Sequence, residues 1–541
     1  MIFSAPEFIF LFLPIAFIGF FLFGAIRPFW AVLWLLGASL VFYGSWRVDF
    51  VPLLLGSMLF NFYLARLITR TSSLPLLVFG IITNLGALIW FKYAGFLAEA
   101  INLLTGLGVP VPQVVLPLAI SFFTFQQIAY LVDVHAGGRR EESVFRYMLF
   151  VTFFPHLIAG PIVHHKEILD QFRLPETYHP HARNLLLGIT AFTIGLFKKV
   201  VIADPLGGVA TMAYAPAADG IAPAFVDSWL GAIAFSLQLY FDFSGYSDMA
   251  IGIALLFGIR LPINFVSPYK AASIIDFWAR WHLTLTRFLT SYVYNPLVMA
   301  ITRRRIAAGK PLLKRSAPAL GPFIALLAFP TLFTMFLAGI WHGAGWQFLV
   351  FGLFHGVLLV INHAWRALRQ YWRIEMNLGA AGHAFCVLLT FLLVTVSFVF
   401  FKSASMDQAM TVLRGMAGLG GDIPVMSRLG GADATEMGVI EMFVWRLSST
   451  QGALIMLGLA IAWLLPNTAR YMEMMAGALD SQTERPPRPT PAQPLIFRLQ
   501  PLTALQPRAG FLEGGFLGAL LALALLRVMS VAPSEFLYFT F

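Results

Sequence analysis

Three histidines stand in an almost wholly apolar stretch, AGIWHGAGWQFLVFGLFHGVLLVINHAW, at residues 338–365. They are His342, His355 and His363. A polar side chain buried among apolar groups raises the free energy of the folded chain unless it is hydrogen-bonded or coordinated. An ionisable group in such a segment is therefore a candidate for function, and neutral imidazole is suited to act as a general base near neutral pH.

The local sequence separates these three histidines. His342 lies in WHGAGW, where two glycines permit a helix break or a close approach of the backbone, so we predict a functional role. His355 is flanked by Gly352 and Gly356, the spacing of tightly packed membrane helices, so we predict a hydrogen-bonded packing role. Packing is also expected for His363. On one continuous helix, His342 and His355 would lie about 20 Å apart, too far to share a substrate atom.

A second group of polar residues lies upstream, within residues 238–288. Five of them interrupt an apolar run: Asp242, Ser244, Tyr246, Ser247 and Asp248. Further along, DFWARWHLTLTR predicts an amphipathic helix at the membrane interface, in which Asp276 and Arg280 pair at i,i+4. His282, in the same segment, is the second candidate for chemistry.

Other signatures of catalysis or metal binding are absent from the sequence. It contains no GxSxG elbow, no P-loop, no HExxH and no CxxC. The adjacent His164 and His165 are too close for ligation from one helix face, and Lys166 follows them, so we expect no metal site. The single cysteine, Cys386, excludes a disulfide framework.

The elements that must position these residues are membrane helices. Of the 541 residues, 59% are hydrophobic and only 11% are charged, whereas soluble domains average about 25% charged residues. Long apolar runs recur, among them 8–26, 323–340 and 384–401, and they approach the length of a membrane span. The sequence predicts an all-α, polytopic membrane protein with about 11 to 13 spans.

The basic residues orient this protein and argue against nucleic acid as a partner. The net charge is +10, but the basic residues cluster in short loops beside spans, at 302–315 and 365–373. Such loops are typical of the cytoplasmic side of a membrane protein, where they face anionic lipid. The alternation of spans then places 403–450 in an extracytoplasmic loop and the Pro-rich 480–510 in a cytoplasmic one. We predict one transmembrane domain, 1–541, without a separate soluble domain.

Several segments together resemble a known family. They are FDFSGYSDMAIGIALLFGIRLPINF, DFWARWHLTLTRFLTSYVYNPL, LAGIWHGAGWQFLVFGLFHG, SFFTFQQIAYLVDVHAG and FFPHLIAGPIVHHKEI. The chain resembles the membrane-bound O-acyltransferases (MBOAT), in particular their bacterial alginate O-acetyltransferase branch. The resemblance implies a ring of helices with funnels from both faces, situated in the bacterial inner membrane. It implies catalytic roles for His342 and His282.

The resemblance also implies the reaction. Acetyl-CoA would be the acyl donor on the cytoplasmic side, no cofactor would be permanently bound, and an exopolysaccharide would be the final acceptor. His342 would take the hydroxyl proton, and His282, if protonated or hydrogen-bonded, would stabilise the oxyanion of the thioester. An extracytoplasmic SGNH-type acyltransferase or an acyl carrier is the expected partner.

Departures from the family pattern leave the acceptor open. Ala279 stands where the family's RRWH form has arginine, and SYVYNPL and DVHAGG replace related stretches. These changes leave His282 and His342 intact, so they bear on glycan or partner contacts. Acetylation of alginate or of another exopolysaccharide, such as a cellulose-like one, is consistent with this sequence. D-alanylation of teichoic acid fits less well.

Two functions without acyl transfer are the alternatives. A transporter or flippase would also keep histidines and broken helices within the membrane, but it would have two related halves, which this sequence lacks. A structural subunit of a polysaccharide export complex would retain acetylation when both histidines are changed. Transfer of label from radiolabelled acetyl-CoA distinguishes acyl transfer from both alternatives.

Overall fold

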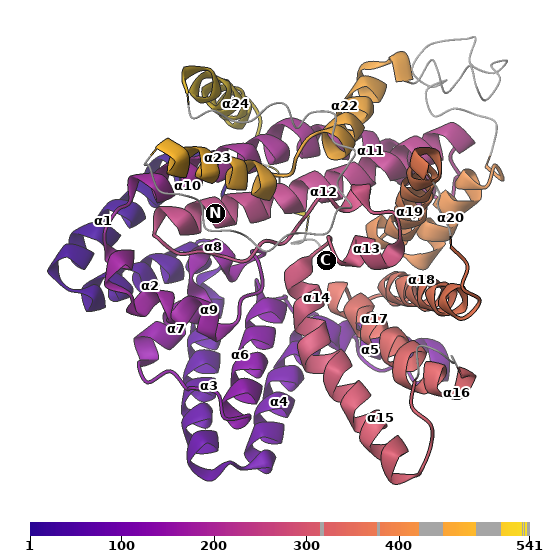
Figure 1. Cartoon of the computed structure of the whole chain (residues 1–541), viewed down its shortest axis with the longest axis horizontal. Coiled ribbons are helices and arrows are strands. Elements are labelled where there is room, and N and C mark those ends of the chain that lie inside the picture. Colours follow the sequence, from indigo (N-terminus) through magenta and orange to yellow (C-terminus); the bar gives the residue numbers. More distant parts are fainter. Residues whose placement is uncertain are drawn as a thin grey trace. The chain divides into compact units, whose positions relative to one another are not determined.

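The computed structural model describes residues 1–313, 319–375, 379–420, 447–482, 510–532, 534, 536 and 537, and within these residues it contains helices and no strands (Figure 1). Of the predicted loop 403–450, the residues 421–446 lie outside the described residues. The same holds for most of the predicted loop 480–510. The described part of the first loop contains a helix, α20 (Met406–Met416).

The chain forms two compact units. The first comprises Met1–Val201, Asp242–Ile263 and Thr468–Thr540, and the second comprises Ile202–Phe241 and Asn264–Asn467. The long helix α12 (Phe225–Leu256) contributes its first half to the second unit and its second half to the first.

The first unit contains the amino-terminal helices and two helices from the end of the chain. Its principal helices are α1 (Leu13–Ile26), α2 (Pro28–Gly44), α3 (Val51–Thr71), α4 (Leu74–Leu88), α5 (Ala94–Thr105), α6 (Ile120–His135), α7 (Val144–Thr152), α8 (Phe154–Leu157), α9 (His165–Leu169), α10 (Ala182–Phe197), α23 (Thr468–Gln482) and α24 (Phe511–Ser530). A short π-helix, η1 (Phe8–Phe12), precedes α1 and continues into it.

The second unit contains the remaining helices and all the histidines proposed for chemistry. Its helices are α11 (Asp204–Ala218), α13 (Ile274–Trp278), α14 (Leu283–Leu289), α15 (Asn295–Ala307), α16 (Leu320–Phe323), α17 (Phe329–His342), α18 (Trp346–Tyr371), α19 (Gly379–Lys402), α20 and α22 (Thr450–Leu464). A π-helical turn, η8 (Thr290–Tyr294), joins α14 to α15.

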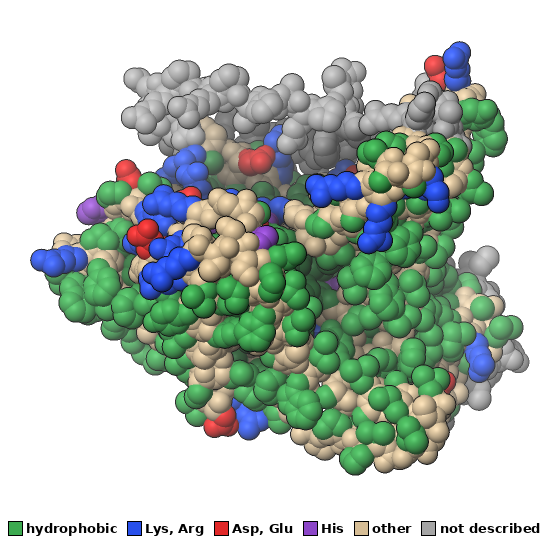
Figure 2. Space-filling model, turned by 90° about the horizontal axis from the view of Figure 1, so that it is seen from below, with side chains coloured by type: hydrophobic (Ala, Val, Ile, Leu, Met, Phe, Trp, Pro, Cys, Tyr) green, Lys and Arg blue, Asp and Glu red, His purple; other side chains and the backbone are tan. Residues whose placement is uncertain are grey.

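The surface and the helix lengths are those of a membrane protein. Hydrophobic side chains cover most of the face seen in Figure 2, and Leu22, Leu104 and Ile82 are each more than 60% exposed. Within the described residues, eight helices are long and apolar enough to cross a bilayer, or nine if the bent pair α22–α23 is one span. The predicted count of about 11 to 13 spans is therefore not confirmed. One reason is that apolar helices such as α2 are short of the length that a span needs.

Buried amides join three helices of the first unit. Asn61 Nδ2 on α3 donates to Asn84 Oδ1 on α4 and to Gln127 Oε1 on α6, both at 3.0 Å. Asn84 Nδ2 donates back to Asn61 Oδ1 at 2.7 Å. Because apolar contact gains little between helices already surrounded by lipid tails, such hydrogen bonds specify which helices pair.

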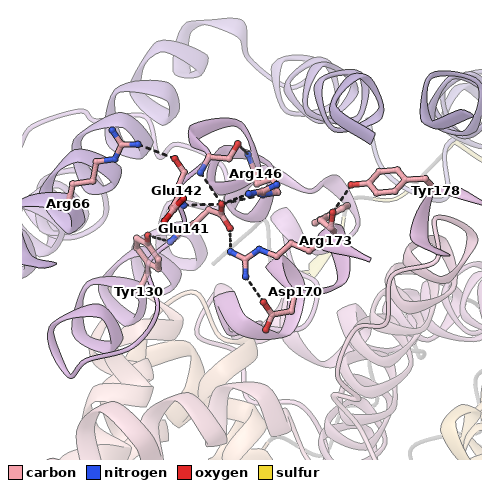
Figure 3. Close-up of polar contacts among 10 residues, drawn as sticks. Arg66, Tyr130, Glu141, Glu142, Arg146, Asp170, Arg173 and Tyr178 are labelled. Atoms are coloured by element: carbon pink, nitrogen blue, oxygen red, sulfur yellow. Dashed lines mark hydrogen bonds and ion pairs between the residues drawn. The ribbon is translucent and has the colours of Figure 1, made fainter. Parts of the chain in front are cut away.

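A buried carboxylate organises the loop that joins α6 to α7. Glu141 Oε1 accepts hydrogen bonds from Arg146 Nη2 at 2.9 Å and from the Ser143 backbone N–H, and Glu141 Oε2 accepts from Arg173 Nη2 (Figure 3). Burial alone raises the pKa of this carboxyl, but the Ser143 amide and the Arg146 guanidinium together hold the pKa of Glu141 below its usual value. The cluster therefore stays ionised and fixes the loop.

Candidate active site

The helix break predicted at WHGAGW places His342 at the end of α17. Gly343, with extended backbone, follows His342, and α18 begins at Trp346. A Cβ on Gly343 would overlap the Phe348 ring, so this turn requires glycine. The His342 imidazole is 4% exposed and contacts the edges of Phe351 on α18 and Phe401 on α19, with ring centres 5.7 and 5.1 Å away.

Close packing of α17 on α18 fixes the direction of this turn. A Cβ on Gly352 would lie 2.8 Å from the Gly339 Cα, so the two backbones touch at these glycines. The prediction that the glycine spacing marks a tight helix contact is thereby confirmed. The two helices run antiparallel, so the residues before α17 and those after α18 lie at one end of the hairpin and His342 lies at the other.

His282 stands at a second break, between α13 and α14. It is fully buried and adopts the left-handed conformation, with φ of 45°. The single amphipathic helix predicted for DFWARWHLTLTR is therefore wrong, because α13 ends at Trp278 and α14 begins at Leu283. Its predicted i,i+4 ion pair is confirmed, with Arg280 Nε 2.8 Å from Asp276 Oδ1.

Asn264 determines which nitrogen of His282 carries the proton. Asn264 Oδ1 accepts hydrogen bonds from the backbone N–H and the hydroxyl of Thr284, at 3.3 and 2.9 Å. This oxygen lies 3.0 Å from His282 Nδ1, which must therefore be the protonated nitrogen of a neutral ring. Burial lowers the pKa of His282 to about 3, so the ring is neutral at physiological pH and Nε2 carries the lone pair.

The two histidines flank the same indole. The Trp341 ring centre lies 4.9 Å from that of His342 and 6.0 Å from that of His282. His282 and His342 are 60 positions apart in the sequence. They lie near each other because the loop 264–282 packs beside the end of α17. Sequence reasoning found both histidines but missed Asn264, because its spacing from His282 carries no periodic signal.

His355 has the packing role that its sequence context predicts. Trp278 Nε1 donates to His355 Nδ1 at 3.3 Å, and His355 Nε2 lies 2.9 Å from Ser397 Oγ. The Ser397 hydroxyl itself donates to the Val394 carbonyl at 2.6 Å, so Ser397 Oγ accepts from the His355 ring. Both nitrogens of His355 are engaged in holding α13, α18 and α19 together.

The polar residues at 242–248 lie in the first unit and form ion pairs. Asp242 Oδ1 is 2.6 Å from Lys199 Nζ, and Asp248 Oδ2 is 2.7 Å from Lys198 Nζ. Asp242 also accepts from the Leu537 backbone N–H at 3.1 Å. These carboxylates therefore join α12 to the π-helical turn η6 (Lys198–Ala203), which follows α10, and to the carboxy-terminal segment, and the geometry gives them a structural role.

His164 and His165 lie beside one carboxylate. Asp133 Oδ2 is 3.5 Å from His165 Nδ1 and 3.9 Å from His164 Nδ1. Among the residues that the structure describes, no group of three or more His, Cys, Asp or Glu side chains has the arrangement of a metal site.

Comparison with known proteins places this arrangement in a family. The family described as MBOAT, membrane-bound O-acyltransferase, matches residues 139–308. A peptidoglycan O-acetyltransferase of Helicobacter pylori is 40% identical over 453 residues, which cover 78% of this chain and 80% of that protein. A probable alginate O-acetylase of Pseudomonas aeruginosa is 34% identical over 570 aligned positions, gaps included, and the alignment covers 100% of both chains. A teichoic acid D-alanyltransferase of Streptococcus thermophilus is 27% identical over 53% of this chain and 68% of that protein.

The fold and these relatives define a helical, multi-pass membrane enzyme. The chain belongs to the membrane-bound O-acyltransferase family, as its motifs predicted. It is an O-acyltransferase, and the transporter and structural-subunit alternatives find no support in its relatives.

Proposed function

We propose that this enzyme moves an acetyl group from acetyl-CoA across the bacterial inner membrane for O-acetylation of an exported polysaccharide. The observation that carries the proposal is the convergence of His282 and His342 on Trp341 in a chain related to O-acetyltransferases over most of its length. An acetyl donor is supported by those relatives, a peptidoglycan O-acetyltransferase and a probable alginate O-acetylase. The exported polysaccharide is therefore an alginate-like or cell-wall glycan.

In the proposed reaction, an acceptor hydroxyl attacks the thioester carbonyl of acetyl-CoA. His342 takes the hydroxyl proton as the new C–O bond forms, the C–S bond then breaks, and the proton passes to the leaving thiolate. His282 is neutral and protonated on Nδ1, so its Nε2 is an acceptor. It accepts a hydrogen bond from a donor group of the substrates other than the attacking hydroxyl and so orients them for attack. This replaces the expectation that His282, if protonated or hydrogen-bonded, stabilises the oxyanion, because a neutral ring of this tautomer has no proton on Nε2 to donate. The reaction needs no permanently bound cofactor.

Replacement of His342 by alanine tests this assignment. His342→Ala removes the base and is expected to abolish acetyl transfer from radiolabelled acetyl-CoA while membrane insertion and yield stay near those of the wild type. His363→Ala, in the same hairpin, is the matched control and is expected to be nearly silent. Retention by His342→Ala of more than about a tenth of the wild-type rate would contradict a general base role, which contributes roughly 10²- to 10⁴-fold.

The proposal includes a relay on the outer side of the membrane. The described part of the segment 403–450 carries few charges with which to bind an anionic polysaccharide. We therefore assign the immediate acceptor to a carrier or to an SGNH-type acyltransferase partner outside the membrane, which then acetylates the glycan. In this scheme the basic loops at 302–315 and 365–373 face the cytoplasm.

A further inference from the structure

Three cationic side chains gather where the loop 264–282 meets the ends of two helices of the second unit. Lys270 Nζ donates to the Leu465 carbonyl, next to the end of α22, at 2.8 Å. Arg366, near the end of α18, lies with Nη2 3.5 Å from Ser273 Oγ. Lys270 and Ser273 are three residues apart, so these contacts lie within about 11 Å of each other along the chain. We call Lys270, Arg280 and Arg366 the loop-mouth cations.

Two of the loop-mouth cations, Lys270 and Arg280, are close enough to repel each other. Burial, and then the neighbouring Arg280 guanidinium, lower the pKa of Lys270. Asp276 lies in the same loop and is engaged by Arg280. A site that brings like charges together in this way is stabilised by an anion, and phosphate is an anion for which lysine and arginine provide matching donors.

The loop 264–282 connects these cations with the histidines. Positions along α18 give the distance between the two ends of this connection. Ser273 lies beside Arg366, Trp278 contacts His355, and His342 contacts Phe351. At about 1.5 Å per residue, His355 lies about 16 Å and Phe351 about 22 Å along α18 from Arg366. The loop therefore runs from Lys270 and from Ser273, beside Arg366, toward the histidines, with His282 at its inner end.

The arm of a pantetheine thioester has the length to span this interval. About fourteen bonds separate its thioester carbon from the first phosphorus atom, and at about 1.2 Å per bond the extended arm reaches about 17 Å. A hydrogen bond from phosphate to a side chain adds about 3 Å. We propose that Lys270 and Arg366 bind the phosphate groups of the acyl donor while its thioester lies between His282 and His342. This inference rests on the proposed function, because it takes the donor to be a pantetheine thioester.

The same comparison of distances excludes the more strongly basic cluster Arg303–Arg305 as the binding site for the donor's phosphate groups. These arginines lie near the end of the continuous helix formed by α14, η8 and α15, which begins immediately after His282. At about 1.5 Å per residue, Arg303 is about 32 Å from His282, which exceeds the length of the arm. This cluster therefore serves as a control with equal loss of charge.

Steady-state kinetics with three donors test the proposal on the purified full-length chain in detergent. The extracytoplasmic partner is supplied as the acceptor at a fixed concentration, and release of the free thiol is measured. The donors are acetyl-CoA, S-acetyl-phosphopantetheine and S-acetyl-pantetheine, of which the last lacks phosphate. The variants are Lys270→Gln and Arg366→Gln, and the control is Arg303→Gln, each of which removes one positive charge. Glutamine retains an N–H donor, so the contacts of Lys270 with Leu465 and of Arg366 with Ser273 can persist.

The expected result is a rise of about tenfold in KM for acetyl-CoA in each variant, with kcat within twofold of the wild type and KM for S-acetyl-pantetheine unchanged. If KM for S-acetyl-phosphopantetheine rises equally, the phosphate next to the arm is the one bound; if it does not, the nucleotide phosphates are. An unchanged KM for acetyl-CoA overturns the inference, because that result is expected if these cations bind only lipid headgroups. So does an equal rise with all three donors, or a rise in the control. Failure of the wild type to use acetyl-CoA at all would instead refute the proposed function.

Discussion

At the scale of single residues, the environment of His282 determines what its imidazole can do. The amide of Asn264 holds the proton on Nδ1, and burial keeps the ring neutral. The left-handed backbone at His282 carries a conformational cost of about 1 to 3 kcal/mol for a residue other than glycine. Such strain persists only where surrounding contacts over-determine it, and here the Leu283 N–H also donates to the Asn264 carbonyl at 3.0 Å.

Replacing His282 by asparagine tests its part in the reaction. Asparagine tolerates the left-handed backbone better than alanine does, so His282→Asn separates lost chemistry from added strain. We expect kcat to fall by roughly 10²-fold or more, while the yield of folded protein stays near that of the wild type. A kcat within threefold of the wild type would show that His282 is not part of the catalytic machinery.

Replacing Asn264 by aspartate is expected to make activity depend on pH in a new way. In the wild type, the pKa of His282 is about 3, so the ring stays neutral from pH 5 upward. A carboxylate at position 264 would favour the imidazolium and raise that pKa. The activity of Asn264→Asp should therefore fall as the pH drops through the raised pKa and recover at higher pH. A kcat profile from pH 5 to 9 that is parallel to the wild-type profile would contradict this role of Asn264.

At the scale of elements, the hairpin of α17 and α18 depends on backbone contact at its glycines. Gly352→Val would place a branched side chain within 2.8 Å of the Gly339 Cα and still closer to the Met335 carbonyl, so the two helices must separate. We expect a loss of folded, monodisperse protein on size-exclusion chromatography in detergent and a lower melting temperature. Gly86→Ala in α4 is the control, because a Cβ there meets nothing within 4 Å. Equal behaviour of the two variants would refute the requirement for contact.

At the scale of the whole molecule, the proposed relay separates acyl transfer across the membrane from acetylation of the glycan. In the proposed relay, the acetyl group crosses about 30 Å of hydrocarbon, from a cytoplasmic thioester to an external acceptor. The purified chain reconstituted in liposomes and supplied with acetyl-CoA should therefore leave free polysaccharide unacetylated until the extracytoplasmic partner is added. Efficient acetylation of polysaccharide by this chain alone would overturn the relay.

The sequence by itself determined the class of fold, the family and both candidate histidines. Hydrophobicity and the scarcity of charge specify membrane helices, and two glycines after His342 specify the break that places it at a helix end, because such features depend on neighbouring residues alone. The same local reasoning identified the Asp276–Arg280 pair and the packing role of His355. Local reasoning failed for the segment DFWARWHLTLTR. Its helical periodicity continues across the break at His282, so the sequence predicted one helix where the structure has two.

Only the tertiary structure decided how these parts act together. It set the tautomer of His282 through Asn264 and brought two histidines that are 60 residues apart next to the same indole, that of Trp341. It also assigned Asp242 and Asp248 to ion pairs with Lys199 and Lys198. It also distinguished two basic clusters of similar composition by their distance from the histidines. The physical reason is that hydrogen bonds, ring contacts and distances between remote residues depend on how helices pack, which no periodicity along the chain encodes.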